Sequence, residues 1–417
     1  MDKNILIINA HSSKNKGDAA IIISMVQSIL KFTPSAKITI SSRYPEDDDI
    51  YKELGCEVVE HLTRYPSQGM SKIQRIKFIK NELNGVKKFF KSGIIPEDRN
   101  SSIFKALEKS DIVVSCGGGF LYSHPKYHIE ASLIMHLSQI YFASKKKKVL
   151  LYSQSIGPFR SLASQKLANW VLNKADTITI REELSRGFLN DIGVNNVEVV
   201  GDSAFTMEMH KPVSDIDSFN IDESAFNIGV TVRQWEFPGK ENRDSLYQEY
   251  INSVAGSIEL LVKNYNSKVY LVPQVTGPTQ IEDDRVANKH IWDKLKDDVK
   301  VNVDFLTNDY TPQELKYIYS KFDMFIGTRM HSNIFSLSSH VPTVAISYEP
   351  KTAGIMEMLG LPEYVIDINE ISLDSLNQAV KKCYTNRFEY SEYLHAEIPK
   401  MKERAEIPAI KINQIIN

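Results

Sequence analysis

An arginine and a histidine stand two positions apart in the stretch Phe-Ile-Gly-Thr-Arg-Met-His-Ser-Asn, which ends at Asn333. Apolar residues before Gly327 indicate a buried strand, and apolar residues after Asn333 indicate one face of a helix. Arg329 and His331 would therefore lie in a strand-to-helix turn, beside helix N–H groups that favour an anion. Open α/β sheets bind ligands at this edge, so these residue types suit a phosphorylated or carboxylated substrate. An ordinary turn with two exposed polar side chains is the alternative interpretation.

Short apolar runs rich in Val and Ile alternate with helix-length segments along the chain. The runs are nearly continuous, which is typical of parallel strands buried on both faces. We predict strands at residues 5–8, 37–41, 57–59, 112–115, 149–153, 177–180, 197–200, 228–232, 268–272, 301–304, 324–326 and 343–346. A helix with the expected apolar period is predicted from Ala19 to Phe32.

A more polar stretch at residues 209–227 separates two comparable halves of this pattern. The fold class predicted from it is α/β, with two doubly wound Rossmann-like domains facing across a cleft. Residues 1–208 would form an N-terminal domain, residues 209–227 a linker and residues 228–385 a C-terminal domain. Residues 386–417 would form a C-terminal segment that packs back on the N-terminal domain.

Polar side chains recur where the predicted strands end, and a shared rim of this kind is how clefts are built. In the first half the rim consists of Asn15, Gly17, Asp18, Gly117, Gly118, Gly119, Ser153, Gln154, Arg181 and Asp202. In the second half it consists of Arg233, Gln274, Arg329, His331, Glu349 and Lys351. The cations of this rim lie in the second half, which predicts an anionic donor there and an acceptor on the glycine-rich first half. Each loop alone also fits plain turn chemistry, and Asp18 fits a helix N-cap better than a catalytic group.

Composition limits the possible functions. The chain has 417 residues, of which 42% are hydrophobic and 24% charged, and this is typical of a globular protein with two or three domains. Its net charge of -2 argues against a dedicated nucleic-acid binder. The three cysteines lack metal-ligand spacing, which suits a reducing compartment without disulfides or structural zinc. We expect no metal, no signal peptide, no membrane span and a cytoplasmic location.

Seven short motifs occur in a fixed order along the chain. They are Asn15-x-Gly17-Asp18, Gly117-Gly118-Gly119, Gln154-x-Ile156-Gly157-Pro158, Arg181-Glu182-x-x-Ser185, Gly201-Asp202, Gly327-x-Arg329-x-His331-Ser332 and Tyr348-x-Pro350-Lys351. Through them, residues from about 4 to about 360 resemble the polysaccharide pyruvyl transferase family. The resemblance implies a fold like that of GT-B glycosyltransferases. It also implies transfer of pyruvate from phosphoenolpyruvate onto two hydroxyls of a sugar, which gives a cyclic ketal.

The resemblance further implies that one arginine and the histidine of the sixth motif contact the donor. The histidine corresponds to His331, and we place the arginine at Arg233, although Arg160, Arg181 and Arg329 compete for this role. The predicted catalytic residues are His331, Arg233 and Arg329. The predicted donor-binding residues are Gln274, Gly327, Ser332, Asn333, Glu349 and Lys351. The predicted acceptor-binding residues are Asn15, Gly17, Asp18, Gly117, Gly118, Gly119, Ser153, Gln154, Arg181 and Asp202.

These residue types also suit the chemistry by themselves. Phosphoenolpyruvate carries a carboxylate and a phosphate, which arginine and lysine side chains bind well. A histidine beside a dianionic phosphate is held protonated, so His331 suits the acid that protonates the methylene carbon. Binding of the phosphate by charge alone is an equally good role for it. Asp18, Asp202 and Glu349 are candidates for the base, and the reaction requires no cofactor.

Residues 72–91 form a basic amphipathic pattern, in which isoleucines and phenylalanines share one helical face among many lysines. Such a helix can lie in a membrane interface. Because the resemblance suggests acceptors carried on a polyprenyl diphosphate, we expect a possible peripheral contact of this helix with the inner face of the membrane. A helix packed on its domain with solvated lysines is the simpler alternative.

Two other functions fit the same fold. One is a nucleotide-sugar-dependent glycosyltransferase with Arg329 and Lys351 on the diphosphate, and the other is a non-catalytic glycan-binding protein. The sequence does not define the acceptor sugar for pyruvyl transfer or for either of these functions.

Overall fold

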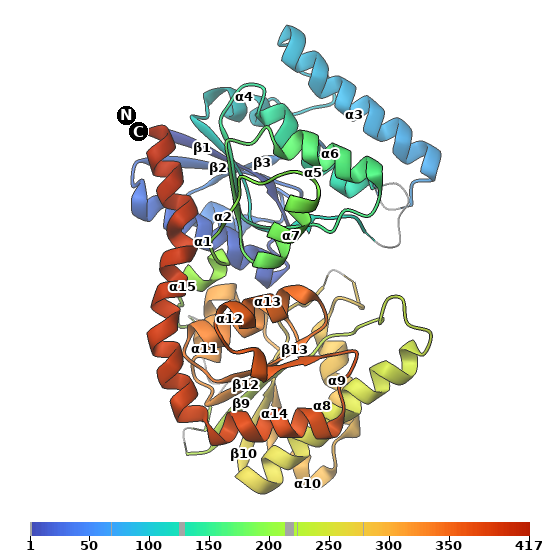
Figure 1. The fold of residues 1–417 in the computed structure, drawn as a ribbon, viewed down its shortest axis with the longest axis vertical. Helices are drawn as coiled ribbons and strands as arrows, with labels where there is room; N and C mark the ends of the chain where they lie inside the picture. The colour runs from blue at the N-terminus through green and yellow to red at the C-terminus, as the bar shows by residue number, and fades with distance from the viewer. Residues whose placement is uncertain (1, 68, 125–129, 213–220, 223, 278) are drawn as a thin grey trace. The chain divides into compact units, whose positions relative to one another are not determined.

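The computed structural model describes residues 2–417 apart from residues 68, 125–129, 213–220, 223 and 278. Its described residues form two compact units, each with a parallel sheet covered by helices (Figure 1). Unit 1 comprises the described residues of Met1–Ser13, Ile21–Thr206 and Glu403–Asn417. Unit 2 comprises those of Lys14–Ala20 and Met207–Lys402.

Unit 1 contains the larger sheet, whose core strand β1 is buried from Ile5 to Ala10. The sheet order is β3-β2-β1-β4-β6-β7-β8, and β5 pairs with β6 off this path. Its strands are β1 (Lys3–Ala10), β2 (Ala36–Ser42), β3 (Glu57–Glu60), β4 (Ile112–Ser115), β5 (Gly118–Leu121), β6 (Val149–Ile156), β7 (Thr177–Ile180) and β8 (Glu198–Val199). Its helices are α1 (Lys16–Phe32), α2 (Asp49–Glu53), α3 (Lys72–Ser92), α4 (Ser102–Lys109), α5 (Ala131–Ala143), α6 (Leu162–Leu172), α7 (Glu183–Asp191) and η1 (Ser203–Thr206), with the first turn of α1 belonging to unit 2.

Unit 2 contains a parallel sheet of six strands in the order β11-β10-β9-β12-β13-β14. Its strands are β9 (Phe226–Thr231), β10 (Ser267–Leu271), β11 (Val303–Phe305), β12 (Met324–Gly327), β13 (Thr343–Ser347) and β14 (Val365–Asp367). Its helices are α8 (Arg243–Tyr265), α9 (Asp284–Lys294), α10 (Asp297–Lys300), α11 (Pro312–Tyr319), α12 (Met330–Ser338), α13 (Pro350–Met358), η3 (Pro362–Tyr364) and α14 (Leu373–Thr385).

The final helix α15 (Arg387–Ile416) contributes residues to both units. Within unit 1, Glu406 forms an ion pair of 2.6 Å with Lys31. Lys411 pairs with Glu198 at 2.9 Å. These contacts attach the last turns of α15 to the elements of unit 1.

The predicted α/β class with two parallel Rossmann-like sheets is confirmed. Strands β5 and β14 were missed, because each is very short and β5 begins inside a run of glycines. The strand predicted at residues 301–304 was placed too early, since Val301 is 78% exposed and the strand begins at Val303. The linker predicted at residues 209–227 extends too far, because β9 begins at Phe226, and its residues 213–220 and 223 lie outside the described chain.

Candidate active site

The carboxyl ends of four neighbouring strands in unit 2 carry the predicted donor residues. Strands β9 and β12 pair in parallel with Thr231 opposite Gly327, so the segments that follow them start side by side. Strand β10 flanks β9 on one side, and β13 flanks β12 on the other. Arg233, Gln274, Arg329 and Glu349 follow these strands, and parallel strands therefore bring them to one edge of the sheet.

The turn after β12 is shaped by a glycine. A Cβ at Gly327 would lie 1.8 Å from Oδ1 of Asn333, so no larger residue fits there. Ser332 of α12 is fully buried and joins this helix to the end of β9, because its Oγ lies 2.7 Å from Oγ1 of Thr231. Helix α12 starts with Arg329 as N-cap and without a side-chain cap. The positive end of the helix dipole therefore lies at this turn, where it favours a bound anion.

Arg329 is held by a buried carboxylate. Its Nη2 lies 2.6 Å and its Nε 3.0 Å from Oδ1 of Asp284, whose side chain is fully buried. Oδ2 of Asp284 accepts the backbone N–H groups of Gln274 and Val275. Burial raises the pKa of Asp284, and the guanidinium of Arg329 opposes that rise. Arg329 thus ties the loop after β10 to the start of α12, and its contact with a substrate stays a prediction.

Arg233 has a different environment. Its guanidinium carbon lies 4.2 Å from the ring centre of Tyr348 and 4.9 Å from that of Trp235. Its Nε donates to the carbonyl of Gln234 at 3.1 Å, and no carboxylate of the described chain lies within ion-pair distance. The side chain is partly exposed. Arg233 is therefore the better placed of the two arginines for an incoming anion.

Tyr250 links the segments after β9 and β12. Its hydroxyl lies 2.8 Å from Oγ1 of Thr328 and accepts the backbone N–H of Arg233 at 3.3 Å. Burial raises the pKa of this phenol, so it stays a neutral hydrogen-bonding group. The Tyr250 hydroxyl therefore holds the backbone of Arg233 close to the turn before His331.

Two buried amides at this edge have hydrogen-bonding groups without a partner in the described chain. Gln274 is 1% exposed, and its Oε1 accepts from the Tyr319 hydroxyl while its Nε2 has no partner. Asn333 is 2% exposed, and neither of its amide atoms has one. Unused buried polar groups are rare and mark places where a ligand or a water completes a network.

The motif Asn15-x-Gly17-Asp18 belongs to unit 2, although we expected it on the N-terminal domain. A Cβ at Gly17 would lie 2.3 Å from Nδ1 of His331, so the imidazole packs directly on the glycine backbone. Lys16 pairs with Asp309 at 3.0 Å, which is a further contact of the motif within unit 2.

The same motif starts helix α1. Oδ1 of Asn15 accepts the backbone N–H of Gly17 at 3.0 Å, and its Nδ2 donates to Oδ2 of Asp18 at 2.9 Å. Asn15 also accepts the N–H of Ala19 through its carbonyl. The expected N-cap at Asp18 is therefore wrong: Asn15 caps the helix, because it directly precedes the first helical residue Lys16, and Asp18 lies inside the first turn.

The segment after β13 carries Glu349 and Lys351. Helix α13 begins at Pro350 with Glu349 as N-cap and no side-chain cap. Nζ of Lys351 lies 4.0 Å from Oε2 of Glu349, and the Glu349 side chain is 45% exposed. This second helix N-terminus adds positive potential to the edge that holds Arg233 and His331.

Gly117 of unit 1 serves close packing. A Cβ at Gly117 would lie 2.9 Å from the carbonyl of Tyr152 and 3.0 Å from Ile21. Gly118 has φ 122°. Its carbonyl accepts Nε2 of Gln154 at 2.8 Å. Gly118 and Gly119 lie inside β5, and Ser153 and Gln154 lie inside β6, so these predicted acceptor residues lie in strands instead of open loops.

Arg181 and Asp202 form a closed buried network. Nη1 of Arg181 lies 2.6 Å from Oδ2 of Asp202, and its Nε lies 3.2 Å from Oε2 of Glu182. Arg181 is 2% exposed and Asp202 1%. Groups so deeply buried hold strand ends together, which argues against Arg181 as the donor arginine and against Asp202 as the base.

A histidine cluster at the edge of the unit 1 sheet was missed in the sequence analysis. His11 follows β1, His61 follows β3, and His136 projects from α5. The rings of His11 and His136 lie 5.3 Å apart, and Phe120 lies 4.8 Å from His11 and stacks at 4.5 Å on His136. Burial and His11 lower the pKa of His61 to about 3, and the same causes lower that of His136. The only signal in the sequence was a histidine directly after an apolar run.

Two absences hold for the described residues. They contain no group of three or more His, Cys, Asp or Glu side chains arranged to hold a metal ion. Among the helices built from them, none has the length and apolarity that crossing a bilayer requires.

The fold resembles that of GT-B glycosyltransferases and sugar-nucleotide epimerases. A glycosyltransferase from Rickettsia africae ESF-5 superposes with a TM-score of 0.60 at 12% identity, over 100% of this chain and 98% of that one. A putative UDP-N-acetylglucosamine 2-epimerase from Listeria monocytogenes gives a TM-score of 0.60 at 10% identity, over 97% of this chain and 94% of that one. At such low identity the likeness shows the fold alone.

Sequence comparison defines the family. Residues 15–350 match the family model described as polysaccharide pyruvyl transferase. The amylovoran biosynthesis protein AmsJ of Erwinia amylovora is 26% identical over 419 residues, covering 98% of this chain and 97% of that protein. The chain belongs to the polysaccharide pyruvyl transferase family, which confirms the resemblance seen in the motifs. The family indicates a transferase with a pyruvyl transfer role in polysaccharide biosynthesis.

The Asp284–Arg329 pair generates a stability prediction. Replacing Arg329 with Met leaves a buried carboxylate without its cation, which we expect to lower the free energy of unfolding by about 3–5 kcal/mol. Arg285→Met is the matched control, because Arg285 pairs with Asp283 on the surface, where its side chain is 50% exposed. That change should cost less than about 1 kcal/mol. Chemical denaturation measures both, and equal losses would contradict a structural role of the buried pair.

The contact of Gly17 with His331 generates a second prediction. Gly17→Ala displaces the imidazole, and because a shift of about 1 Å can cost roughly 100-fold in rate, we expect a large loss of pyruvyl transfer. Gly187→Ala is the control, since Gly187 lies in α7 with nothing within 4 Å of an added Cβ. Steady-state turnover and melting temperature are measured for both variants. Wild-type turnover in Gly17→Ala would show that the ring position does not matter.

Proposed function

We propose that the protein transfers the pyruvyl group of phosphoenolpyruvate onto two hydroxyls of one sugar in a polysaccharide precursor, forming a cyclic ketal. The observation that carries this proposal is the grouping of Arg233, His331 and the start of α12 at one edge of the unit 2 sheet. Two cationic side chains beside a helix N-terminus suit a small donor with two anionic groups.

In the proposed binding mode, Arg233 contacts the donor carboxylate or phosphate, and its position over Tyr348 and Trp235 restricts the guanidinium plane. A guanidinium held in this way loses little freedom when it binds. The N-terminus of α12 and Lys351 supply further positive potential for the phosphate. Positive groups of this chain would thus balance the negative charges of the donor, and the proposed reaction uses no cofactor.

In the proposed reaction, protonated His331 gives its proton to the methylene carbon, which becomes the methyl group of the product. The adjacent carbon then bonds to the first sugar hydroxyl, whose proton returns to the imidazole. Phosphate leaves as the second hydroxyl bonds to the same carbon, and that hydroxyl's proton goes to phosphate or to a base. Among the earlier candidates for this base, the partly exposed Glu349 and Asp18 of the unit 2 edge are better placed than the buried Asp202.

The two reacting hydroxyls belong to one sugar of a glycan, in the proposal carried by a polyprenyl diphosphate and modified in the cytoplasm. The glycine-rich edge of unit 1 was predicted to bind this acceptor. Gly117 and the Arg181 network are occupied in packing, so the partly exposed aromatic and histidine residues His11, Tyr65 and Tyr122 are better candidates for sugar contact. Aromatic faces bind sugar C–H groups through their large apolar area.

Donor choice tests the proposed function. Incubation with phosphoenolpyruvate and a panel of glycans should release phosphate only when an acceptor is present. Incubation with nucleotide sugars and the same glycans should release no nucleotide. Nucleotide release would support the alternative of a glycosyltransferase, and binding of glycans with neither release would indicate a glycan-binding protein.

The roles of His331 and Arg233 give a kinetic prediction. His331→Gln should lower kcat by about 100-fold or more, the usual effect of losing a general acid, with little change in KM for phosphoenolpyruvate. Arg233→Met should raise that KM by about 10- to 100-fold, because charge-assisted hydrogen bonds contribute about 1.5–3 kcal/mol. Both variants should keep the parent melting temperature.

Other changes in kcat and KM would assign different roles to these residues. A raised KM with near-normal kcat in His331→Gln would assign His331 to phosphate binding by charge alone. An unchanged KM in Arg233→Met would move the donor arginine elsewhere, first to Arg329.

A further inference from the structure

Helices α3, α5 and α6 of unit 1 enclose a groove of about 550 Å³ that the proposed reaction does not use. Its floor is apolar and aromatic and is formed by Leu83 and Phe90 of α3, Leu137 and Tyr141 of α5, and Leu167 and Trp170 of α6. The indole of Trp170 is 47% exposed and lies 4.5 Å from the ring of Tyr141. A floor of this kind accepts a hydrocarbon chain.

Lysines surround this floor. Lys87 and Lys91 of α3 line one wall, and Lys145 and Lys146 line the other at the end of α5. The ammonium of Lys145 lies 4.8 Å from the ring of Tyr141, and that of Lys146 lies 5.0 Å from the ring of Phe89. Glu108 is the one carboxylate of the described residues that pairs with a lysine of this rim, at 3.6 Å from Lys146. The rim therefore has a net positive charge.

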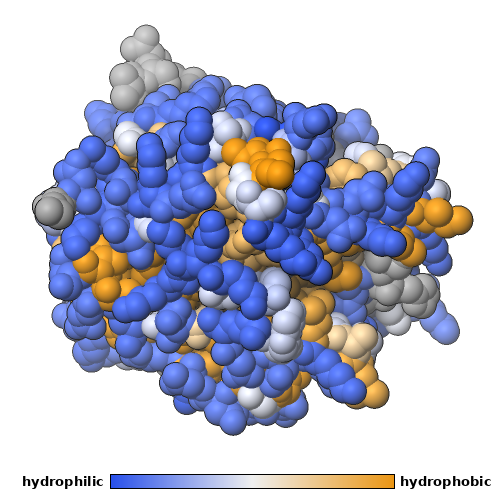
Figure 2. All heavy atoms as spheres, turned by 90° about the horizontal axis from the view of Figure 1, so that it is seen from above, coloured by the Kyte–Doolittle hydropathy of each residue, from blue (hydrophilic) through white to orange (hydrophobic). Residues whose placement is uncertain are grey.

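The outer face of α3 continues this character away from the groove. Ile73 and Ile76 are 79% and 53% exposed, and Ile94 just beyond the helix is 52% exposed. The helix contains a single acidic residue, Glu82, which is buried. Hydrophobic patches also interrupt the hydrophilic surface seen in Figure 2. Exposed isoleucines among lysines, without an exposed acid, are typical of helices that lie in a membrane interface.

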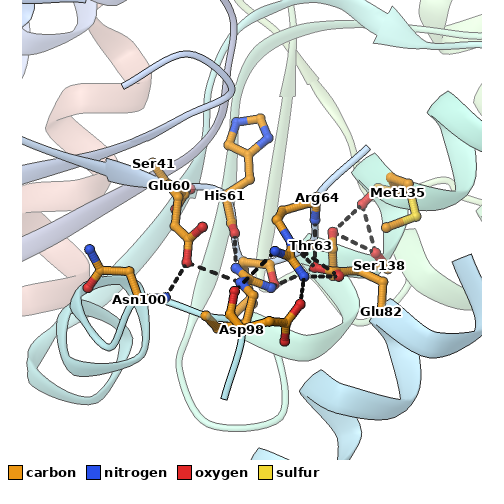
Figure 3. A network of polar contacts seen from close by, with 12 residues as sticks. Ser41, Glu60, His61, Thr63, Arg64, Glu82, Asp98, Asn100, Met135 and Ser138 are labelled. Carbon is orange, nitrogen blue, oxygen red and sulfur yellow. Dashed lines mark hydrogen bonds and ion pairs between the residues drawn. The ribbon is translucent and has the colours of Figure 1, made fainter. Parts of the chain in front are cut away.

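Glu82 determines which face of α3 points outward. Its Oε1 lies 2.6 Å from Nη1 of Arg99. Its Oε2 lies 3.0 Å from Nη2 of Arg64, and Figure 3 shows Glu82 and Arg64 side by side. The side chains of Glu82 and Arg99 are 5% and 1% exposed. Arg99 also donates to the carbonyl of Leu62, which attaches the helix to the segment after β3. The orientation of the lysines is thus fixed by a buried network.

We propose that this groove binds an anionic lipid of a bilayer, with an acyl chain on the aromatic floor and the phosphate on the lysine rim. The charges of the groove are complementary to those of such a lipid, because the rim offers lysines with almost no competing carboxylate. Asn84 and Ser138 are the only uncharged, non-aromatic polar side chains among its described lining residues, so the lining is mainly apolar apart from the lysines. Lysines that extend over aromatic rings match side chains at bilayer interfaces, where the apolar stem is buried and the ammonium meets phosphate. Unit 1 would thereby dock on the membrane through α3, α5 and α6. This inference does not depend on the proposed pyruvyl transfer.

Vesicle binding tests the charge requirement. The full chain should sediment with phosphatidylglycerol vesicles and not with phosphatidylcholine vesicles. The variant Lys87→Gln, Lys91→Gln, Lys145→Gln, Lys146→Gln should bind at least about 30-fold more weakly, since each basic residue near an anionic surface adds to the attraction. The control Lys211→Gln, Lys240→Gln, Lys294→Gln, Lys381→Gln removes the same charge at exposed positions of unit 2 and should bind like the parent.

Fluorescence locates the lipid. The chain has three tryptophans, so the background Trp235→Phe, Trp292→Phe leaves Trp170 as the single reporter inside the groove. Bromine on the acyl chains of phosphatidylglycerol should quench this fluorescence. Circular dichroism and melting temperature verify that each variant is folded.

Three results would overturn the proposal. They are equal binding to neutral vesicles, equal losses in the groove variant and the unit 2 control, and vesicle binding without quenching of Trp170. Binding of an acidic amphipathic peptide at the groove without any vesicle binding would assign the site to a protein partner instead.

Discussion

The edge of the unit 2 sheet depends on one buried ion pair, that of Asp284 with Arg329. Its carboxylate accepts two backbone N–H groups from the loop after β10 and the guanidinium that precedes α12. Through this pair the start of α12 keeps a fixed position, and His331 lies in the first turn of that helix. A buried charge without its partner is costly, so loss of this pair would destabilise the edge of the sheet.

The two arginines near this pair have different partners. Arg329 has its charge balanced inside the protein, whereas Arg233 is held by aromatic rings and a backbone carbonyl. Two arginines that look equivalent in the sequence therefore have different environments. Gly17 completes the arrangement, since the absence of its side chain leaves room for the imidazole of His331.

Much of the fold was predictable, because parallel strands buried on both faces are continuous apolar runs, as in β6 and β12. The position of His331 at a strand-to-helix turn was predictable for the same reason. The partners of polar residues were not: Asp284 lies 45 residues before Arg329, and no local pattern connects them. The tasks of Gly117 and Arg181 were also hidden, because close packing and buried pairing depend on distant segments such as Tyr152 and Asp202.

The histidine cluster of unit 1 is a second example of contacts that the sequence alone did not predict. A histidine after an apolar run carries little information by itself, and only the sheet brings His11 near His136.

In the proposed reaction the second carbon of phosphoenolpyruvate becomes the ketal carbon of the product. NMR can therefore follow phosphoenolpyruvate labelled at this carbon into the glycan. We expect the label to appear as a ketal carbon bonded to two oxygens of one sugar, with one phosphate released per ketal. Phosphate release with the label only in free pyruvate, or in a singly linked enol ether, would contradict the proposed transfer.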